Sequence, residues 1–259
     1  MTAPKASLTW WSFVDRGVEP HDLIRAAAAM GYDGIELAEE PLWPGIADAG
    51  LAIATHRGHD TLEDGLNRQE NHDRIERELL ANLKLAQRWR IPILICFSGN
   101  RNGTSDDAGL ENTALGLSRV ARAAEDAGVT LALELLNSRI DHPGYQCDRT
   151  AWGLSVIDRV ASPRVKLLYD VYHMQIMEGD VIRTIETHHD AFAHYHVAGN
   201  PGRHEPDRSQ ELWYPAIYRA ITATGFAGYI GMEYIPRHEP VASLQAALHD
   251  LRGDGVMGS

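Results

Sequence analysis

The chain has 259 residues, of which 44% are hydrophobic, and a formal net charge of −12 at pH 7. This length suits one barrel-type domain, and the apolar content is too high for a disordered chain. The acidic charge disfavours nucleic acid as a partner, because binding to a phosphate backbone needs clustered Lys and Arg. It also gives no reason to expect a partner in an anionic membrane surface.

Cys96 and Cys147 are the two cysteines of the sequence. This small number favours two reduced thiols over a disulfide framework or a thiolate metal site. The N-terminal segment MTAPKASLTWWSF lacks the apolar core and cleavage site of a signal peptide. No apolar stretch approaches the roughly 20 residues that span a bilayer. We therefore expect a cytoplasmic protein.

Short apolar runs alternate with helical segments along the chain. Eight of these runs are predicted to be strands: Leu8–Phe13, Gly34–Leu37, Ala52–His56, Ile93–Ser98, Thr130–Asn137, Val165–Tyr172, Ala193–Ala198 and Tyr229–Tyr234. Eight β–α alternations in this length favour a closed parallel barrel over an open doubly wound sheet. Glycine-rich phosphate loops are absent from the sequence, which weighs against nucleotide binding. The predicted fold is α/β, with a single (β/α)8 TIM barrel as one domain over residues 1–259.

Four of the intervening segments carry clear helical signals: HDLIRAAAAMG, NHDRIERELLANLKLAQRWR, ENTALGLSRVARAAEDAG and YPAIYRAITATG. In the second segment, Ile75, Leu79, Leu83 and Ala86 recur at helical spacing. Helices are expected to end at three glycines: Gly31, Gly128 and Gly225. The polar segment GNRNGTSDDAG, residues 99–109, is either a mobile active-site loop or an ordinary surface loop.

A carboxylate stands near the end of the fifth predicted strand, T-L-A-L-E-L-L-N. Alternation of side chains places Glu134 on the face opposite Leu131, Leu133 and Leu135. If the leucines pack outward against helices, Glu134 points into the barrel. A lone carboxylate there is costly unless it is paired, hydrogen-bonded or bound to a cation.

The next three predicted strands repeat this pattern with Asp170, then His194 and His196, then Glu233. Barrel active sites are built from such strand ends. Three acids at one level would repel each other, and a bound divalent cation would remove this repulsion. Carboxylates with one imidazole suit Mn²⁺, Mg²⁺ or Co²⁺ better than structural zinc. Taken singly, each glutamate can instead be satisfied by a backbone donor or by Lys166, and His196 can be a hydrogen-bonded core residue.

The segments ELLNSRIDHPGY, LLYDVYHMQIMEGD, HVAGNPGRHEPD and GYIGMEYIPR resemble the hydroxypyruvate isomerase family, within the superfamily of xylose-isomerase-like barrels. The resemblance runs from about the third to the eighth strand and includes GHDTLEDGLN and FSGNRNG. It implies a divalent metal with four ligands: Glu134, Asp170, His196 and Glu233. It further implies that the two glutamates form the catalytic proton-transfer pair and that His173 and Arg203 contact the substrate.

For several of these residues the sequence also allows another role. His173 can simply pack beside its strand, and Arg203 can be a solvated loop charge. His56 and His59, in THRGHD, can also reach the pocket and bind substrate.

Two positions depart from the resemblance. Some hydroxypyruvate isomerases have a glutamine as the seventh-strand ligand, whereas His196 resembles the related ketose 3-epimerases. Those epimerases carry a further substrate-binding glutamate shortly after the fifth strand, where this chain has Ile140. Asp141 or His142 can take its place.

The predicted activity is isomerisation of a small sugar or oxo-acid, such as hydroxypyruvate to tartronate semialdehyde, by proton transfer through a metal-stabilised enediolate. A ketose 3-epimerase would use the same site but return the proton to the opposite face of the same carbon. A metal-dependent endonuclease of this superfamily would need more ligands and a basic surface. A non-catalytic sugar-binding barrel would lack a metal ligand. The expected partner is therefore a small molecule, with no nucleic acid or membrane, and a homo-oligomer is left open.

Overall fold

The computed structural model describes residues 4–253, and all eight predicted strands are present in it. They are β1 (Lys5–Thr9), β2 (Gly34–Glu36), β3 (Ala52–Arg57), β4 (Ile93–Cys96), β5 (Thr130–Glu134), β6 (Val165–Asp170), β7 (Phe192–Val197) and β8 (Tyr229–Met232). The strands follow one another in chain order around a closed barrel, with parallel pairing, for example, of β4 with β5 and of β7 with β8. The prediction of a (β/α)8 barrel is confirmed.

The first strand begins and ends earlier than predicted. The sequence predicts a strand over Leu8–Phe13, whereas β1 ends at Thr9 and the short helix α1 (Trp10–Val14) follows at once. The side chains of Trp10 and Phe13, both on this helix, are buried. The prediction is wrong here because a short apolar run does not by itself distinguish a strand from a buried helical turn.

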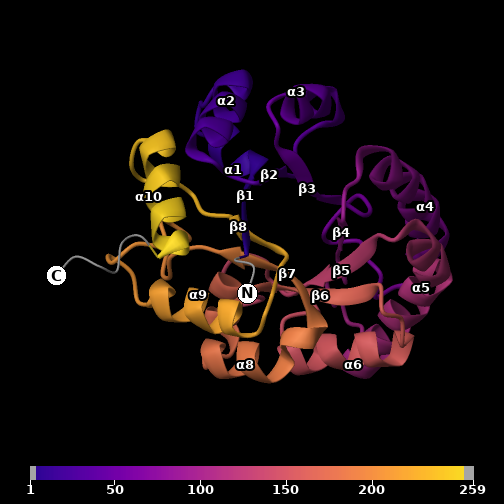
Figure 1. Cartoon of the computed structure of the whole chain (residues 1–259). Helices are drawn as coiled ribbons and strands as arrows, with labels where there is room; N and C mark the ends of the chain where they lie inside the picture. Colours follow the sequence, from indigo (N-terminus) through magenta and orange to yellow (C-terminus); the bar gives the residue numbers. More distant parts are fainter. Residues whose placement is uncertain (1–3, 254–259) are drawn as a thin grey trace. The chain divides into compact units, whose positions relative to one another are not determined.

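The described chain packs as two compact units. Residues 4–54, 180–189 and 195–253 form the first unit, which contains the helices α2 (Pro20–Met30), α3 (Trp43–Asp48), α8 (Val181–His188), α9 (Tyr214–Ala223) and α10 (Pro240–Arg252). Residues 55–179 and 190–194 form the second, which contains α4 (His72–Trp89), α5 (Asp106–Ala127), α6 (Thr150–Val160) and α7 (Val171–Met177) (Figure 1). Three short 3-10 helices, η1, η2 and η3, span Glu40–Leu42, Gln69–Asn71 and His189–Ala191. A single domain over 1–259 stays a prediction, and the ends of that range lie outside the described residues.

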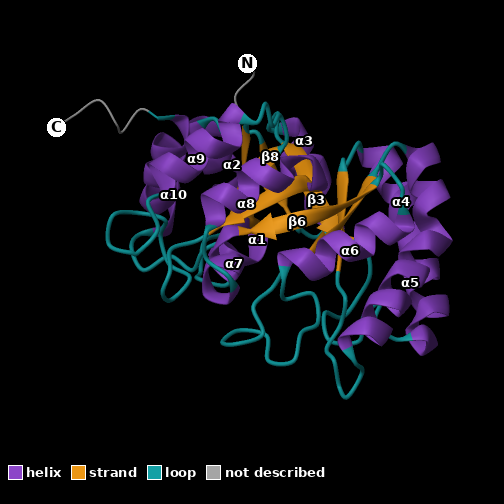
Figure 2. Ribbon diagram, turned by 90° about the horizontal axis from the view of Figure 1, so that it is seen from below, coloured by secondary structure: helices purple, strands orange, loops and turns teal. Residues whose placement is uncertain are grey.

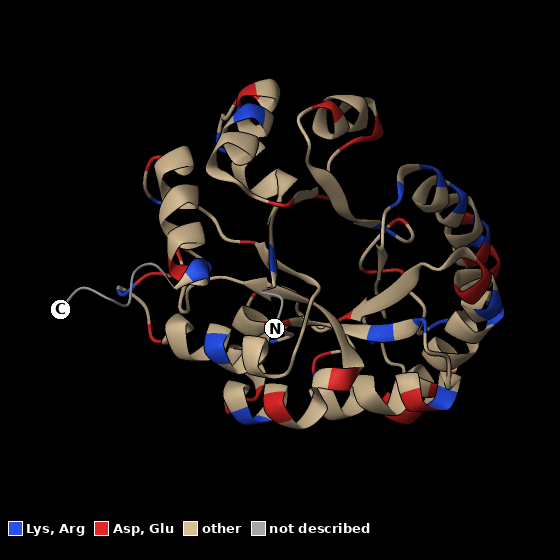
Figure 3. Cartoon of the chain, viewed as in Figure 1, with Lys and Arg blue, Asp and Glu red and all other residues tan. Residues whose placement is uncertain are grey.

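The long helix α4 buries the stripe that its sequence predicts. Ile75, Leu79, Leu83 and Ala86 are each no more than 3% exposed, whereas the adjacent Leu80 is 37% exposed. Its charged residues are exposed or half-buried, and acidic and basic residues are interspersed along α4 (Figure 3). The apolar stripe therefore fixes which face of α4 turns inward.

Two of the three predicted glycine caps are confirmed. Gly31 ends α2 and Gly128 ends α5, both in the left-handed backbone region. After α9 the cap residue is Thr224, and Gly225 follows it with a positive φ. In each case the chain turns from helix toward the next strand at the glycine.

The polar segment 99–109 is partly helical. Its last four residues form the first turn of α5, which Ser105 caps by accepting a hydrogen bond from the Ala108 backbone N–H at 3.2 Å. Within the preceding loop, Arg101 forms ion pairs with Asp106 and Asp148. This loop and the longer one after β5 belong to the irregular connections drawn in teal in Figure 2. Movement of the loop stays a prediction.

Cys96 and Cys147 are buried and unbridged, and burial raises the pKa of the Cys96 thiol to about 12. Both side chains therefore behave as small apolar core groups. Between residues 4 and 253, no helix combines the length and apolar character that crossing a membrane requires.

The stripe on α4 gives a stability prediction. Leu79→Ala should lower the free energy of unfolding by about 2–5 kcal/mol, because it leaves a cavity in a fully buried site. The matched control Leu80→Ala should cost less than about 1 kcal/mol, since this side chain is already largely hydrated. Urea denaturation of both variants tests the difference, and equal losses would contradict the assigned inward face.

Candidate metal and substrate site

The first carboxylate of the site is the last residue of β5. Glu134 is only 5% exposed. The Tyr145 hydroxyl donates to the Glu134 carbonyl oxygen at 3.0 Å and accepts from the Ser98 backbone N–H at 3.1 Å. Burial raises the pKa of Tyr145 far above its usual value, so the hydroxyl remains a donor. Tyr145 thereby ties the end of β5 to the chain that follows β4.

The second carboxylate ends β6 and begins a helix. Asp170 is 1% exposed, and its Oδ1 accepts a hydrogen bond from the His173 backbone N–H at 3.0 Å, which caps α7. The predicted strand Val165–Tyr172 stops at Asp170 for this reason, since an aspartate at the N-cap satisfies a helix donor. The capped turn also brings His173 Nε2 to 3.7 Å from Asp170 Oδ2.

The orientation of the His173 ring is set by Asn137, which follows β5. Asn137 Oδ1 accepts from the backbone N–H groups of Ile140 and Asp141 at 2.9 and 3.0 Å, which fixes the orientation of its amide. Its Nδ2 therefore faces His173 Nδ1, at 2.6 Å, and donates to it. A neutral His173 then carries its ring hydrogen on Nε2. Such a ring is a hydrogen-bond donor on that side.

The loop after β5 brings two further polar residues beside His173. Asp141 Oδ2 accepts from Asn137 Nδ2 at 2.5 Å and from the Tyr172 hydroxyl at 2.9 Å. The His142 ring lies 5.3 Å from the His173 ring, centroid to centroid. Ile140, in contrast, is 66% exposed. The two residues named from the sequence as substitutes for an epimerase glutamate thus lie near His173.

Two carboxylates contact the histidine of β7. His196 is fully buried; its Nε2 lies 3.1 Å from Glu36 Oε2 and its Nδ1 lies 3.1 Å from Glu233 Oε2. Glu233 directly follows β8, and its Oε2 also accepts from Arg203 Nη2 at 2.6 Å. Arg203 is 12% exposed in its side chain, and its guanidinium lies over the Trp11 ring. The alternative of a solvated loop charge is therefore wrong for Arg203.

Two groups of possible metal ligands occur within residues 4–253, and all their members are buried. One group is Glu134, Asp170, His196 and Glu233, and the other is Glu36, His194 and His196. Lys166 cannot neutralise the first group, because its Nζ donates to the Asp190 carbonyl oxygen in an exposed position. Three carboxylates and one imidazole match the donor preference of Mn²⁺, Mg²⁺ or Co²⁺.

The two histidines of THRGHD differ in their surroundings. His59 Nε2 accepts from the Phe97 backbone N–H, and its Nδ1 lies 3.0 Å from the Asp60 carbonyl oxygen. Backbone groups thus engage both ring nitrogens of His59, and its predicted contact with the substrate stays a prediction. His56 belongs to β3, and burial lowers its pKa to about 4. A substrate contact of His56 stays a prediction.

Glu36 contacts the predicted ligand His196, and Asn137 contacts the predicted substrate residue His173; neither was predicted from the sequence. Glu36 ends the apolar run GIE just as Glu134 ends TLALE, so the same signal was present in β2. Asn137 carries no comparable signal, because asparagine after a strand is ordinary turn chemistry.

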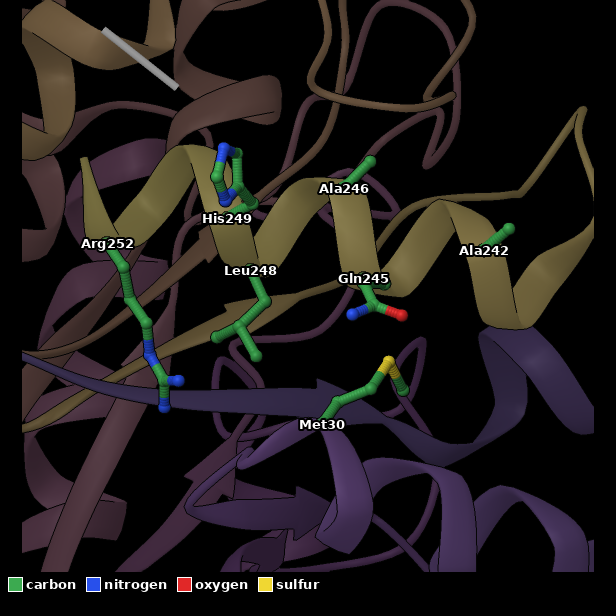
Figure 4. A pocket seen from close by; sticks show the side chains of 7 residues that line it. All are labelled: Met30, Ala242, Gln245, Ala246, Leu248, His249 and Arg252. Atoms are coloured by element: carbon green, nitrogen blue, oxygen red, sulfur yellow. The ribbon is translucent and has the colours of Figure 1, made fainter. Parts of the chain in front are cut away.

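A separate cavity of about 520 Å³ lies between α2 and α10. In Figure 4, Met30 of α2 points toward Gln245 and Leu248 of α10, and Arg252 lies at the end of the same helix. None of the predicted site residues lines this cavity. It therefore plays no part in the site described above.

Fold and site together define a barrel with carboxylates and an imidazole at its strand ends. A family model described as xylose isomerase-like TIM barrel matches residues 24–252. The chain belongs to this family.

Individual relatives agree with the resemblance found in the sequence. The chain is 39% identical to the 2-oxo-tetronate isomerase of Cupriavidus necator over 135 residues, which are 52% of this chain and 50% of that protein. The chain thus spans about half the length of this relative. It is 28% identical to the putative hydroxypyruvate isomerase of Homo sapiens over 237 residues, 85% of this chain and 86% of that protein. The predicted similarity to hydroxypyruvate isomerases is confirmed.

A solved structure is similar over nearly the whole chain. This crystal structure, described as an AP endonuclease of family 2 from Brucella melitensis, has a TM-score of 0.84 and 27% sequence identity. The match covers 94% of this chain and 97% of that one.

The half-buried His56 gives a pH prediction. Its pKa is about 4 in the fold and 6.5 in the unfolded chain, so the fold favours the neutral ring. The unfolded chain takes up a proton first as pH falls, so the stabilisation is present above pH 6.5 and is lost toward pH 4.

Replacing the ring by an amide should remove this pH dependence. Between pH 7 and about 4.5, His56→Gln should lose about 2–3 kcal/mol less stability than the wild type. Urea denaturation at the two pH values measures the difference, with the exposed His21→Gln as control. Parallel pH curves for wild type and His56→Gln would contradict a neutral half-buried ring.

Proposed function

We propose that this protein is a divalent-metal-dependent isomerase of a small oxo-acid or sugar, with Glu134, Asp170, His196 and Glu233 as its metal ligands. The observation that carries the proposal is the presence of three buried carboxylates and a buried imidazole at the ends of four successive strands. An oxo-acid is supported by the relatives, which are named 2-oxo-tetronate isomerase and putative hydroxypyruvate isomerase. Hydroxypyruvate is therefore the first substrate to test.

The reaction requires removal of a proton from a carbon next to a carbonyl group. Mn²⁺, Mg²⁺ or Co²⁺ at these four residues would supply Lewis-acid stabilisation of the negative charge that builds on oxygen. Glu134 and Glu233 are the candidate bases, since each ends a strand and is nearly buried. One glutamate takes the proton, and the other serves the neighbouring carbon or oxygen.

The remaining site residues bind and orient the substrate in this proposal. Arg203 holds the Glu233 carboxylate at 2.6 Å and offers a cation to a substrate carboxylate or hydroxyl oxygen. His173 offers its Nε2–H as a donor, because Asn137 occupies its Nδ1. Both contacts would hold the carbon acid at a fixed distance from the two glutamates.

A ketose 3-epimerase is the second candidate. It is favoured by Asp141, whose carboxylate is oriented by Asn137 and Tyr172 beside His173, in the loop where the epimerases carry their additional glutamate. Assay of hydroxypyruvate, 2-oxo-tetronates and ketoses with added metal, and identification of the products by NMR, distinguishes the two. A binding protein without activity would yield no product from any of them.

The two glutamates give the main test. Glu134→Gln and Glu233→Gln should each lower turnover by about 10²-fold or more at saturating metal, because an amide cannot accept the proton. Solvent deuterium exchange at the carbon next to the carbonyl separates the roles: one variant should lose exchange, while the other can retain exchange without forming product.

Controls accompany this test. Glu186→Gln, on the exposed face of α8, removes the same charge and should retain wild-type turnover. Wild-type protein stripped by a chelator should be inactive and recover when Mn²⁺ is added. Near-normal turnover in both glutamine variants at saturating metal would show that the two-glutamate mechanism is wrong.

The similarity to a protein described as an AP endonuclease makes DNA a necessary comparison substrate. With a net charge of −12, the chain should show neither cleavage of abasic-site DNA nor salt-dependent binding to it. Gel assays with Mn²⁺ or Zn²⁺ test cleavage, and fluorescence anisotropy at two salt concentrations tests binding. Tight duplex binding at physiological salt would contradict the small-molecule assignment.

A further inference from the structure

A second carboxylate stands behind the histidine of the proposed metal centre. Glu36, the last residue of β2, is 0% exposed. Its Oε1 accepts a hydrogen bond from Ser7 Oγ at 2.5 Å, and its Oε2 lies 3.1 Å from His196 Nε2. A carboxylate buried to this degree is costly unless its oxygens have partners, and both have one here.

The strand register shows how Glu36 reaches His196. His196 on β7 pairs with Gly231 on β8, and Gly231 pairs with Ser7 on β1. Glu36 on β2 pairs with Thr9, which lies two residues farther along β1. The Glu36 side chain therefore extends over β1 and β8 to reach β7.

Gly231 leaves the room for this contact. A Cβ atom at this position would lie 2.2 Å from Glu36 Oε1 and 2.8 Å from His196 Cδ2. Any residue other than glycine would therefore force Glu36 or His196 to shift. A glycine in β8 thus leaves space for the contact between Glu36 of β2 and His196 of β7.

We propose that Glu36 is a positioning residue for His196, an inference that rests on the proposed metal centre. A neutral imidazole carries one N–H, and the Glu36 carboxylate accepts it from Nε2. The lone pair is then on Nδ1, the nitrogen that lies 3.1 Å from Glu233 and that would bind the metal. Ser7 holds the other oxygen of Glu36, so the ring cannot rotate without breaking this chain of contacts.

Such a carboxylate behind a histidine ligand fixes the ring tautomer and increases the ligand's basicity. Glu36 would accordingly act on metal affinity, while touching neither metal nor substrate. This distinguishes it from Glu134 and Glu233, to which proton transfer is assigned.

The test is Mn²⁺ binding to the full chain, measured by isothermal titration calorimetry on chelator-stripped protein. Glu36→Ala should raise the dissociation constant for Mn²⁺ by about 10- to 100-fold. Glu36→Gln should raise it by a smaller factor, because the amide retains a hydrogen-bond acceptor. The matched control is Asp33→Asn, because this exposed carboxylate precedes the same strand and accepts from the Ala6 backbone N–H. It should bind Mn²⁺ as the wild type does.

A second readout reports the tautomer directly. In ¹⁵N-histidine-labelled protein with Mg²⁺ bound, the His196 ring, assigned by comparison with His196→Asn, should carry its hydrogen on Nε2. Glu36→Ala should lose this preference. A hydrogen on Nδ1 in the wild type would overturn the inference.

The outcomes separate the inference from the proposed function. If wild type binds Mn²⁺ and both Glu36 variants bind it equally well, the positioning role is wrong while the metal centre stands. If the wild type itself binds no Mn²⁺, the metal centre fails and the inference fails with it. Should Glu36→Ala not fold, Glu36→Gln alone decides, since it preserves shape and hydrogen bonding.

Discussion

Compensation of buried negative charge is the constraint on which the site depends. Glu134, Asp170 and Glu233 each stand at the end of a strand, almost without access to water. Carboxylates in such places must be paired with a cation or with hydrogen-bond donors. Part of this compensation comes from the chain itself, since Arg203 contacts Glu233 and the α7 backbone contacts Asp170. The remainder matches the charge of a divalent ion, which is why the donor set points to metal chemistry.

The residues around these acids make specific polar contacts that apolar packing alone would not require. Gly231 opens a path for Glu36, and Ser7 and His196 take up its two oxygens. On β5, the Tyr145 hydroxyl joins the end of the strand to Ser98. These contacts place polar groups at fixed positions, as the proposed removal of a proton from a weakly acidic carbon requires.

Much of the architecture follows from local patterns. Seven of the eight strands lie within a few residues of their predicted positions, because each is a short apolar run closed by polar or helix-capping residues. The first strand is misplaced because Trp10 and Phe13 extend its apolar run into a buried helical turn. Asp170 shows the same limit at the other end of a strand: alternation alone does not reveal that its carboxylate caps a helix.

The sequence by itself determined the alternation of strands and helices and the acids at the strand ends, because both are written in local periodicity. Tertiary structure decided which of these polar groups meet. The engagement of His59 by the Phe97 backbone, the contact of Asn137 with His173 and the pairing of Glu36 with His196 each join residues far apart in the chain. Contacts of this kind depend on strand register and on space left by a single glycine, which no local pattern encodes.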